Sequence, residues 1–395
     1  MQRLFVWLGR ILLGLVGLAV LGVVAFWLIA PRMVGSARNN VIDHDPYPVS
    51  DKAAALHDTL IVGDWHADPL LWKRDLTKRG DWGQVDFPRL VEGNVAFQVF
   101  TAVTKSPAGL NYEENSAEAF DNITLLAFGQ LWPIRTWTSL YERAAYQADK
   151  MARFAEEDGS VTIIRSADDI DAVLAARAEG RDQMGAILGI EGSHPLEGDL
   201  ANLDRLVDKG HRVFGLHHFF DNELGGSLHG QANSGLTDFG RAVVAEIAAR
   251  PLILDLAHSS AKVVEEVLAM TDIPLVVSHT GVTAYCETPR NLSDDLMKAV
   301  AQTGGTVGIG YWDEVSCGKI DPASIAEMIA AAVELLGEDH VSLGSDFDGS
   351  VETAFDTSEL AALTQGLLDQ GLSEDQIAKV MGGNMVRVLK ARLGG

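Results

Sequence analysis

Residues 251–279 read PLILDLAHSSAKVVEEVLAMTDIPLVVSH, and this stretch decides the fold class. It holds two short apolar runs, Pro251–Leu256 and Pro274–Val277, separated by a segment whose apolar residues recur with helical spacing. Continuous apolar strands joined by a helix are typical of a parallel sheet covered on both faces. Each run is followed, after one intervening residue, by a histidine, His258 or His279. The stretch therefore predicts a strand–helix–strand unit with polar groups at the carboxyl ends of its strands.

The same alternation extends in both directions along the chain. Eight strand–helix units predict a (β/α)8 TIM-like barrel, with a long helical insertion near Glu113–Glu157 after the second strand. An open doubly wound sheet is the main competitor, but it more often shows a glycine-rich phosphate loop after its first strand, and Gly63-Asp64-Trp65-His66 is not such a loop. The eight predicted strands are Thr59–Asp64, Asn94–Phe100, Met184–Ile190, Arg212–Leu216, Pro251–Leu256, Pro274–Val277, Gly305–Gly310 and His340–Gly344.

Titratable side chains gather at one end of these predicted strands. This end of a barrel is its catalytic rim, whereas histidines of a structural core would be scattered along the strands. The pattern therefore favours an enzyme site. The residues concerned are His66 and Asp68 after strand one, Glu191 after strand three, His218 after strand four, His258 after strand five, His279 after strand six and Asp346 after strand eight.

Composition excludes several classes of protein. The chain has 395 residues, 47% of them apolar and 22% charged, which is a globular mix and not a disordered or low-complexity one. Lys and Arg number 31 against 55 Asp and Glu, and the resulting net charge of −24 argues against nucleic acid as a partner. The two cysteines, Cys286 and Cys317, exclude a disulfide-dense scaffold and a four-cysteine zinc cluster.

The N-terminus predicts a membrane segment. Ile11–Ala30 is an uncharged, mostly apolar run, and as a helix it would rise about 30 Å, the thickness of a bilayer core. It ends in Phe26-Trp27-Leu28-Ile29, which suits an uncleaved anchor better than the small-x-small exit of a signal peptide. We therefore expect residues 1–35 to anchor the protein in a lipid bilayer, residues 36–50 to form a linker and residues 51–395 to form the barrel domain.

The positive charges on the two sides of the apolar run are nearly equal, so they hardly distinguish the two orientations of the anchor. Arg3 and Arg10 precede the apolar run, and Arg32 and Arg38 follow it. The free amino terminus adds one positive charge before the run, which favours the cytoplasmic side of the membrane for the N-terminal end. The expected topology is single-pass, with the catalytic domain in the periplasm or outside the cell.

The residues at the rim have the composition of a two-metal hydrolase site. His66 and Asp68 are two apart, so an extended chain points both to the same face, and neutral His258 and His279 would suit zinc or a similar ion. Glu191 near the barrel axis would be costly unless cations flank it, and as a bridge it would hold two metals about 3.5–4 Å apart. Each residue alone has an ordinary structural interpretation, such as a capping pair or a rim salt bridge. Together they favour the metal site.

Charge counting is consistent with this interpretation. Two divalent cations would carry four positive charges, and Asp68, Glu191 and a bridging hydroxide would carry three negative ones. The carboxylate of Asp346 would bring the cluster close to neutrality and take the proton of the attacking water.

With these motifs the sequence resembles the membrane (renal-type) dipeptidases, zinc-dependent enzymes of the amidohydrolase superfamily. The resemblance covers nearly all of residues 55–395. The matching motifs are Asp64–Asp68, Gly189–Gly192, Asp255–His258, Ser278–His279, Pro289-Arg290-Asn291 with Asp294-Asp295, and Gly344–Gly349.

The resemblance implies a role for each matching residue. One zinc would be held by His66, Asp68 and Glu191, and the other by Glu191, His258 and His279. Asp346 would shuttle the proton, His218 would stabilise the developing oxyanion, and Arg290 would bind the substrate carboxylate. The guanidinium of an Arg can bind a free carboxylate through two parallel hydrogen bonds, although Arg290 could instead pair with Asp294 or Asp295.

The implied activity is that of a membrane-anchored zinc dipeptidase, which cleaves dipeptides with a free C-terminal carboxylate by attack of a metal-bridging hydroxide. Relatives accept a D-residue at the C-terminal position and commonly form homodimers. Cys286 and Cys317 match two positions that are disulfide-bonded in mammalian relatives, and two reduced buried cysteines are the alternative. An oxidising compartment would allow the bond.

Two departures from the family pattern concern the substrate. Phe219-Phe220-Asp221-Asn222-Glu223 is bulkier than the Ser-x-Asn stretch usual after the oxyanion histidine, and His217 beside His218 leaves that histidine ambiguous. The bulky stretch motivates a second hypothesis, a two-metal amidohydrolase acting on another amide or a lactam. A third is a barrel kept as a non-catalytic scaffold, which loss of a metal ligand would favour.

Overall fold

The computed structural model describes residues 2–394 and confirms the barrel. Eight parallel strands follow one another in the order β2-β1-β9-β8-β7-β6-β5-β4, and a β2–β4 pairing closes the ring. The barrel strands are β1 Val62–Ala67, β2 Val95–Val103, β4 Met184–Glu191, β5 His211–Gly215, β6 Ile253–Asp255, β7 Val276–Thr280, β8 Thr306–Ile309 and β9 Val341–Leu343. Each overlaps one of the eight predicted runs.

One further strand, β3 (Val161–Ile163), was not predicted. It pairs with Met184–Ala186 at the start of β4, before β5 joins that strand at Leu188. A three-residue strand outside the ring shows too little alternation in the sequence to be distinguished from a loop.

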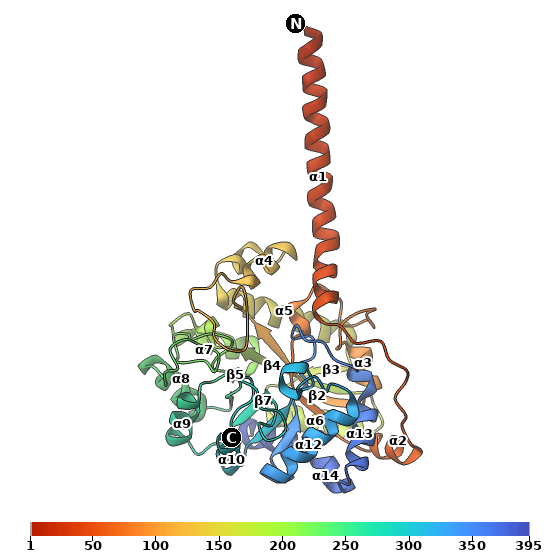
Figure 1. Ribbon diagram of the computed structural model, residues 1–395, viewed down its shortest axis with the longest axis vertical. Coiled ribbons are helices and arrows are strands. Elements are labelled where there is room, and N and C mark those ends of the chain that lie inside the picture. The colour runs from red at the N-terminus through yellow and green to blue at the C-terminus, as the bar shows by residue number, and fades with distance from the viewer. Residues whose placement is uncertain (1, 395) are drawn as a thin grey trace.

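Helices surround the barrel and connect its strands (Figure 1). The helices are α1 Gln2–Arg38, α2 Asp51–His57, α3 Phe87–Glu92, α4 Asn122–Gly129, α5 Leu140–Asp158, α6 Ala167–Ala178, α7 Ala201–Lys209, α8 Asp238–Ala249, α9 Ala261–Met270, α10 Asp294–Gln302, α11 Asp313–Ser316, α12 Pro322–Leu336, α13 Leu360–Asp369, α14 Glu374–Ala378 and α15 Asn384–Leu393. Short helical turns lie at η1 Pro69–Leu71, η2 Ile134–Trp137, η3 His194–Leu196, η4 Thr357–Glu359 and η5 Lys379–Gly383.

The insertion after β2 becomes helical only at Asn122, later than predicted. The side chain of Asn111 accepts hydrogen bonds from the backbone amides of Glu113 (2.9 Å) and Glu114 (2.8 Å), and Asn115 Nδ2 donates back to Asn111 O (2.7 Å). These local bonds satisfy the backbone without a helix. The helical part consists of α4, η2 and α5.

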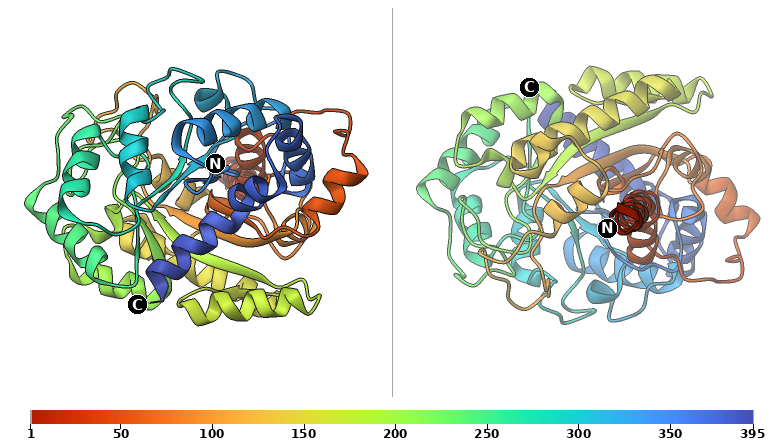
Figure 2. Two further views of the ribbon diagram at one scale, coloured as in Figure 1. Left: turned by 90° about the horizontal axis from the view of Figure 1, so that it is seen from below. Right: turned by 90° about the horizontal axis from the view of Figure 1, so that it is seen from above.

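Helix α15 closes the barrel at the end where the strands begin (Figure 2, left). Its Met385 and Val388 pack in one buried cluster with Ile187, Val213 and Ile253, which come from three barrel strands. Burial of such branched side chains contributes about 1.5–3 kcal/mol each, so this end of the barrel is a packed core. The opposite end, where the strands terminate, is free to hold polar groups.

The N-terminal helix α1 extends away from the barrel domain (Figure 1) and is long and apolar enough to cross a membrane. It continues to Arg38, three residues beyond the predicted anchor. The chain that follows lies on the domain, because Asn39 is buried and Ile42 N donates to Thr353 O (2.8 Å).

Candidate metal centre

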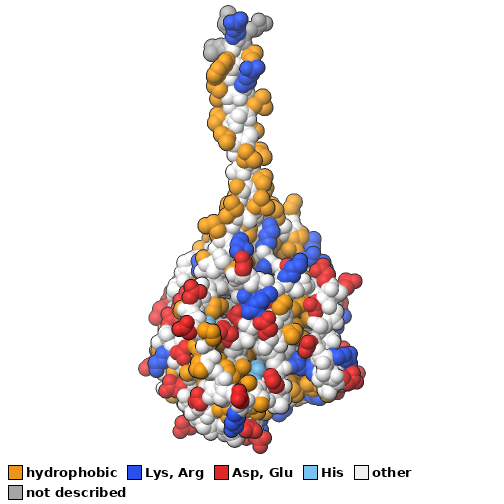
Figure 3. Space-filling model, turned by 90° about the vertical axis from the view of Figure 1, so that its right-hand side faces the viewer, with side chains coloured by type: hydrophobic (Ala, Val, Ile, Leu, Met, Phe, Trp, Pro, Cys, Tyr) orange, Lys and Arg blue, Asp and Glu red, His pale blue; other side chains and the backbone are white. Residues whose placement is uncertain are grey.

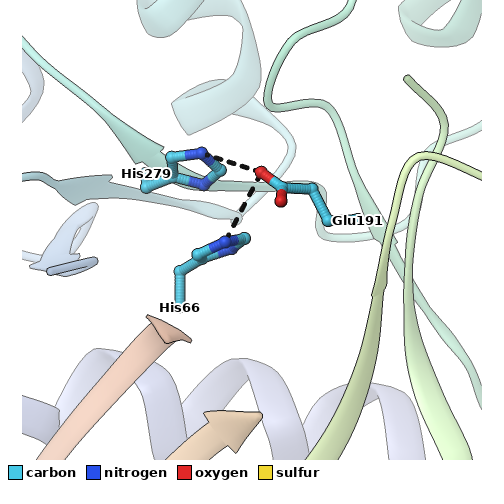
Figure 4. Close-up of side chains that lie close together, drawn as sticks. All are labelled: His66, Glu191 and His279. Carbon is cyan, nitrogen blue, oxygen red and sulfur yellow. Dashed lines mark ion pairs between the residues drawn. The ribbon is translucent and has the colours of Figure 1, made fainter. Parts of the chain in front are cut away.

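The carboxylate of Glu191, the last residue of β4, lies at the centre of a cluster of imidazoles. Its Oε1 atom is 3.5 Å from His66 Nε2, 3.4 Å from His279 Nε2 and 3.2 Å from His258 Nε2. Figure 4 shows the side chains of His66 and His279 converging on this carboxylate. Its other oxygen, Oε2, is 3.4 Å from His218 Nε2.

Two further carboxylates complete the cluster beside His66. Its Nε2 atom lies 3.4 Å from Asp68 Oδ2 and 3.8 Å from Asp346 Oδ1. The structure thus brings together the five predicted metal ligands and both predicted catalytic residues, all of them buried. Three overlapping sets have the spacing of a metal site: His66, Glu191 and His279; Glu191, His218 and His258; and His66, Asp68 and Asp346.

A buried aspartate connects β1 to the loop after β9. Asp64 Oδ1 accepts hydrogen bonds from the backbone amides of His66 (2.9 Å) and Ser345 (3.1 Å). Asp346 N in turn donates to His66 O (3.1 Å). These bonds place the His66 imidazole and the Asp346 carboxylate on the same side of the rim.

A second buried aspartate connects β6 to β7 in the same way. Asp255 Oδ1 accepts from the amides of Ala257 (3.0 Å) and Ser278 (2.9 Å). His258 and Asp346 both have left-handed backbone, with φ of 60° and 61°, so each side chain turns back into the barrel mouth. A non-glycine residue with positive φ is uncommon and is concentrated at functional sites.

The cluster attracts positive charge. Burial alone lowers the pKa of His66, but the carboxylates of Glu191, Asp68 and Asp346 raise it to about 10. Burial raises the pKa of Glu191. Burial also raises the pKa of Asp346 well above its usual value, and the nearby carboxylates of Glu191 and Asp68 raise it further. A divalent cation would supply this charge in place of protons.

The donor set fits such a cation. Burial and the neighbouring cationic Arg290 lower the pKa of His258 and His279, so both rings are neutral and offer lone pairs. The Nδ1 atom of His279 is bonded to Ser278 Oγ (2.8 Å), which leaves its Nε2 directed at Glu191. Imidazole nitrogens and carboxylate oxygens are ligands that zinc and similar divalent ions accept.

The structure distinguishes the two adjacent histidines after β5. His217 is turned away from the cluster and its Nδ1 is bonded to Ser259 Oγ (3.1 Å). His218 lines the cavity above the cluster, and its Nδ1 donates to Lys105 O (3.2 Å). Because a carbonyl only accepts, this bond leaves His218 Nε2 as the atom that faces Glu191 and the cavity.

Arg290 enters the cluster from the loop before α10. Its Nη2 atom donates to His279 O (2.9 Å) and lies 3.3 Å from His258 Nε2, and its guanidinium lies 5.2 Å from the Trp312 ring centroid. The side chain is 1% exposed, and its Nε has no hydrogen-bond partner among residues 2–394. Asp294 and Asp295, the alternative partners, form no ion pair with Arg290 in the same range. A buried guanidinium in this state is suited to bind an anionic group.

A cavity of about 570 Å³ opens above these side chains. Tyr112, Phe219 and Trp312 form its walls, so the bulky residue after His218 contacts the space where a substrate would lie. Its outer part is lined by α1 and α4, through residues such as Val34 and Leu126.

Several residues at the site were not predicted. Thr101 Oγ1, near the end of β2, donates to Asp68 Oδ1 and to Ala67 O (2.9 Å). Its position near a strand end was a usable signal, as were Asp64 and Asp255 a few residues before a predicted ligand. Tyr112 has no such signal, because it lies in the irregular part of the insertion and contacts Trp312 (Nε1 to OH, 3.2 Å) only through the fold.

Comparison with known proteins agrees with this geometry. A family model described as membrane dipeptidase (peptidase family M19) matches residues 50–392. Dipeptidase aclJ of Aspergillus oryzae (strain ATCC 42149 / RIB 40) is 30% identical over 351 residues, which span 82% of this chain and 76% of that protein.

Solved structures share the fold. Dipeptidase AC, a metallopeptidase of family M19, is 25% identical with a TM-score of 0.69, covering 85% of this chain and 100% of that one. A metallopeptidase from Rhodobacter sphaeroides, crystallised with a phosphinate mimic of the dipeptide L-Ala-D-Ala, is 24% identical with a TM-score of 0.67 over 85% of this chain and 99% of that one. The family is metal-dependent, in agreement with the His, Glu and Asp cluster. The chain therefore belongs to the membrane dipeptidase family, peptidase family M19, and is a hydrolytic enzyme of the metallo-dipeptidase type.

Proposed function

We propose that this protein is a membrane-anchored dipeptidase that uses two zinc ions bridged by Glu191 to hydrolyse dipeptides with a free C-terminal carboxylate. The observation that carries the proposal is the position of the Glu191 carboxylate, with Oε1 within 3.5 Å of three imidazole nitrogens and Oε2 facing His218. A carboxylate so surrounded is suited to bind two cations at once.

Five residues would hold the metals. His66, Asp68 and Glu191 form one ligand set, and Glu191, His258 and His279 form the other. When bound, the metal pair supplies an activated water nucleophile and polarises the scissile carbonyl. Thr101 orients the Asp68 carboxylate through its hydroxyl hydrogen bond, and the amide hydrogen bonds to Asp64 and Asp255 orient the histidines. Such supporting bonds tune metal affinity as well as geometry.

Asp346 and His218 would act on the reacting atoms. The raised pKa of Asp346 lets its carboxylate take a proton from the nucleophile and return it to the leaving amine. His218 would donate from Nε2 to the tetrahedral oxygen. Because its Nδ1 hydrogen is already donated to Lys105 O, a hydrogen on Nε2 makes His218 an imidazolium. Its positive charge would stabilise the developing oxyanion.

Arg290 would bind the substrate's terminal carboxylate. Its buried guanidinium lines the cavity, with Nη2 3.3 Å from Nε2 of the proposed metal ligand His258. Binding of a free carboxylate at this depth favours dipeptides over longer chains. The L-Ala-D-Ala mimic bound by the Rhodobacter sphaeroides enzyme supports the proposal that a C-terminal D-residue is accepted.

The anchor would place this site outside the cytoplasm. Residues 1–35 would span the membrane, residues 36–50 would link this anchor to the domain, and residues 51–395 would form the catalytic domain. Cys286 and Cys317 form a disulfide with a Cα–Cα distance of 5.7 Å, which confirms the expected pairing. Disulfides persist in oxidising compartments, so the bond supports a periplasmic or extracellular domain.

A second candidate function rests on Phe219. This ring lines the cavity and stacks on His229 with centroids 5.0 Å apart, which makes the wall beside His218 apolar. An amidohydrolase that acts on a bulkier amide or a lactam would use the same metals with this wall.

The experiment that tests both is metal analysis of the full-length protein in detergent, together with hydrolysis of Gly-D-Ala, Gly-L-Ala, acylated amino acids and lactams. About two zinc ions per chain with chelator-sensitive dipeptide cleavage is the expected result. Two zinc ions with cleavage of lactams or acyl amino acids alone would favour the second candidate. Absence of bound metal after zinc is supplied would contradict the proposed mechanism.

A further inference from the structure

The surface of the insertion carries an unusual concentration of exposed apolar side chains. Outside α1, five large apolar residues in the described part of the chain are more than 40% exposed, and all five lie between Phe120 and Ile134. Four of them, two on α4 and two in the turn and η2 that follow it, define what we call the α4 apolar face: Leu125 (59% exposed), Phe128 (42%), Leu131 (51%) and Ile134 (75%). Exposed apolar residues scattered singly need no explanation, but their concentration in one short segment marks a candidate interaction surface.

The part of this face around Phe128 and Gly129 lies against the last apolar turns of α1. The rings of Trp27 and Phe128 are 6.0 Å apart in an edge-to-face arrangement. A Cβ on Gly129 would lie 4.0 Å from the ring of Phe26. Figures 1 and 2 both show α4 beside α1 where that helix meets the domain. The face is therefore continuous with the surface of the predicted membrane span.

The junction between α1 and the domain is packed. Pro31, Gly35 and Asn39 recur every four residues and are buried against the domain. A Cβ on Gly35 would come within 2.4 Å of the Trp82 ring, so a larger residue at this position would have to displace that ring. Helix α1 therefore determines how the domain is oriented relative to the bilayer.

The depth of α4 follows from this packing. The apolar run of α1 ends at Ala30, so Trp27 would lie at the membrane interface, the preferred depth of tryptophan. Phe128 contacts Trp27 and would lie at the same depth. Interfacial elements bury their apolar side chains about 5–10 Å into the boundary between headgroups and acyl chains.

The charge distribution agrees. No residue from Asn122 to Ile134 is charged, although the chain as a whole carries a net charge of −24. Exposed basic side chains flank this segment. Arg32 (side chain 61% exposed) is ion-paired with Asp81, Arg135 (51%) is ion-paired with Glu142, and Lys73 Nζ lies 3.5 Å from Trp27 O. Figure 3 shows several basic side chains around the foot of α1, with an acidic one among them, and side chains of both signs over the rest of that view. The acidic side chains beside the segment, Asp81 and Glu142, are thus each paired with a basic one, which reduces their repulsion from anionic lipid.

We propose that the α4 apolar face is a second membrane contact, which lays the mouth of the catalytic cavity on the lipid surface. This inference rests on the anchor of the proposed function. The cavity runs from Glu191 and His218 to Leu126 of α4 and to Phe26 and Val34 of α1, so its outer end opens between the two membrane-contacting helices. Substrates that partition into the interface, namely dipeptides that bear an apolar group, would reach the metals without leaving the lipid surface.

The test uses the full-length protein in lipid nanodiscs, with a bimane label on the introduced cysteine of Ile134→Cys. The native cysteines are paired in a disulfide and do not label under non-reducing conditions. Lipids brominated in the upper acyl chain quench a label that lies among them. Val16→Cys in α1 reports membrane insertion, and Met270→Cys at the end of α9 is the matched control, an exposed apolar position on the part of the domain remote from α1.

The expected result is a loss of most of the bimane emission at positions 134 and 16 in brominated discs, with no change at position 270. Quenching at position 16 without quenching at 134 would leave the anchor intact and overturn the second contact. Absence of quenching at position 16 would refute the anchor and this inference with it. A label at 134 that is protected from aqueous iodide but not quenched by lipid would show that a second protein copy covers the face, which also overturns the inference, as would equal quenching at position 270.

Discussion

His258 Nε2 and His279 Nε2 lie 2.9 Å apart at the ends of neighbouring strands, and both face Glu191 Oε1. Only one hydrogen can lie between two such nitrogens, and burial keeps both imidazoles neutral by lowering their pKa. The hydrogen bonds of Asp255 to the amides of Ala257 and Ser278 hold the two strand ends in this position. The protein therefore keeps two imidazole nitrogens and a carboxylate oxygen together, an arrangement that a cation stabilises.

Substitution of the central carboxylate is expected to remove metal. Glu191→Gln keeps the volume of the side chain but loses the charge that would bridge two cations, so bound metal should fall by at least one ion per chain and activity should nearly vanish. Metal content is measured by mass spectrometry after gel filtration. Glu246→Gln, on the exposed surface of α8, is the matched control and should keep full metal and activity. Unchanged metal content in Glu191→Gln would contradict the bridging role.

Asp346 and Asp348 form a matched pair of aspartates with opposite expected roles. Both have left-handed backbone, which Asn tolerates, but Asp346 faces the cavity whereas Asp348 accepts hydrogen bonds from the Gln84 and Val85 amides and pairs with Arg74. Asp346→Asn should keep metal and melting temperature while kcat falls by about 10²–10⁴-fold. Asp348→Asn should lower the melting temperature, with kcat of the folded fraction retained. The reverse pattern would exclude Asp346 as the proton shuttle.

Arg290 is expected to determine the preference for a free carboxylate. Arg290→Lys keeps the positive charge but loses the two-pronged geometry, so we expect KM for free dipeptides to rise by about 10–100-fold, the size of one or two charge-assisted hydrogen bonds. Dipeptide amides should be affected much less. The measurement is the ratio of kcat/KM for free and amidated dipeptides, and an unchanged ratio would remove Arg290 from substrate recognition.

Metal removal should also destabilise the fold. Without cations the carboxylates of Asp68, Glu191 and Asp346 share one buried space, and ligand binding stabilises a folded protein by RT ln(1 + [L]/Kd), about 2.7 kcal/mol at 100 times Kd. Dialysis against a chelator should lower the melting temperature, and added zinc should restore it. A melting temperature that is independent of chelator and zinc would show that the cluster binds no metal in the folded state.

The barrel could be predicted because its strands are buried on both faces and therefore appear as continuous apolar runs. The polar residues that follow these runs were predicted for the same reason. Strand β4 is free of charge until its last residue, Glu191, and the apolar run Pro274–Val277 ends two residues before His279. The details that depend on local competition could not be predicted. Hydrogen bonds to the side chain of Asn111 take the place of the first helical turns predicted for the insertion, and the spacing of apolar residues gives no sign of this.

Other features depended on contacts distant in sequence. His217 and His218 are adjacent in the sequence, where the strand end favours His218, and the contact of His217 with Ser259, 42 residues away, shows that the His217 ring turns into the core. Tyr112 reaches the cavity because the insertion folds over the rim against Trp312, 200 residues further along the chain. The packing of α1 on α4 through Trp27 and Phe128 is a contact of the same kind, and neither helix predicts its partner.

Lys150 gives a prediction on pH that is independent of metal binding. This α5 lysine is buried, donates to Leu70 O (3.0 Å) and to Trp72 O just after Asp68, and has no carboxylate partner within ion-pair distance among residues 2–394. Burial, together with the charges of Arg74 and Arg153, lowers its pKa to about 7. Between this value and the unfolded value of about 10.4, the unfolded chain binds more protons than the folded one, so stability rises with pH.

Lys150→Met should lack this dependence. The difference in free energy of unfolding, wild type minus variant, is expected to increase from pH 7 to pH 10 with a slope of at most about 1.4 kcal/mol per pH unit, and to be constant below pH 7 where both states of the wild type are protonated. Chemical denaturation at a series of pH values measures it. Lys52→Met, at a position whose side chain is 66% exposed, is the control and should show no such slope. A flat difference for Lys150→Met would mean that the buried amine keeps its proton across this range, held by the two carbonyl groups alone.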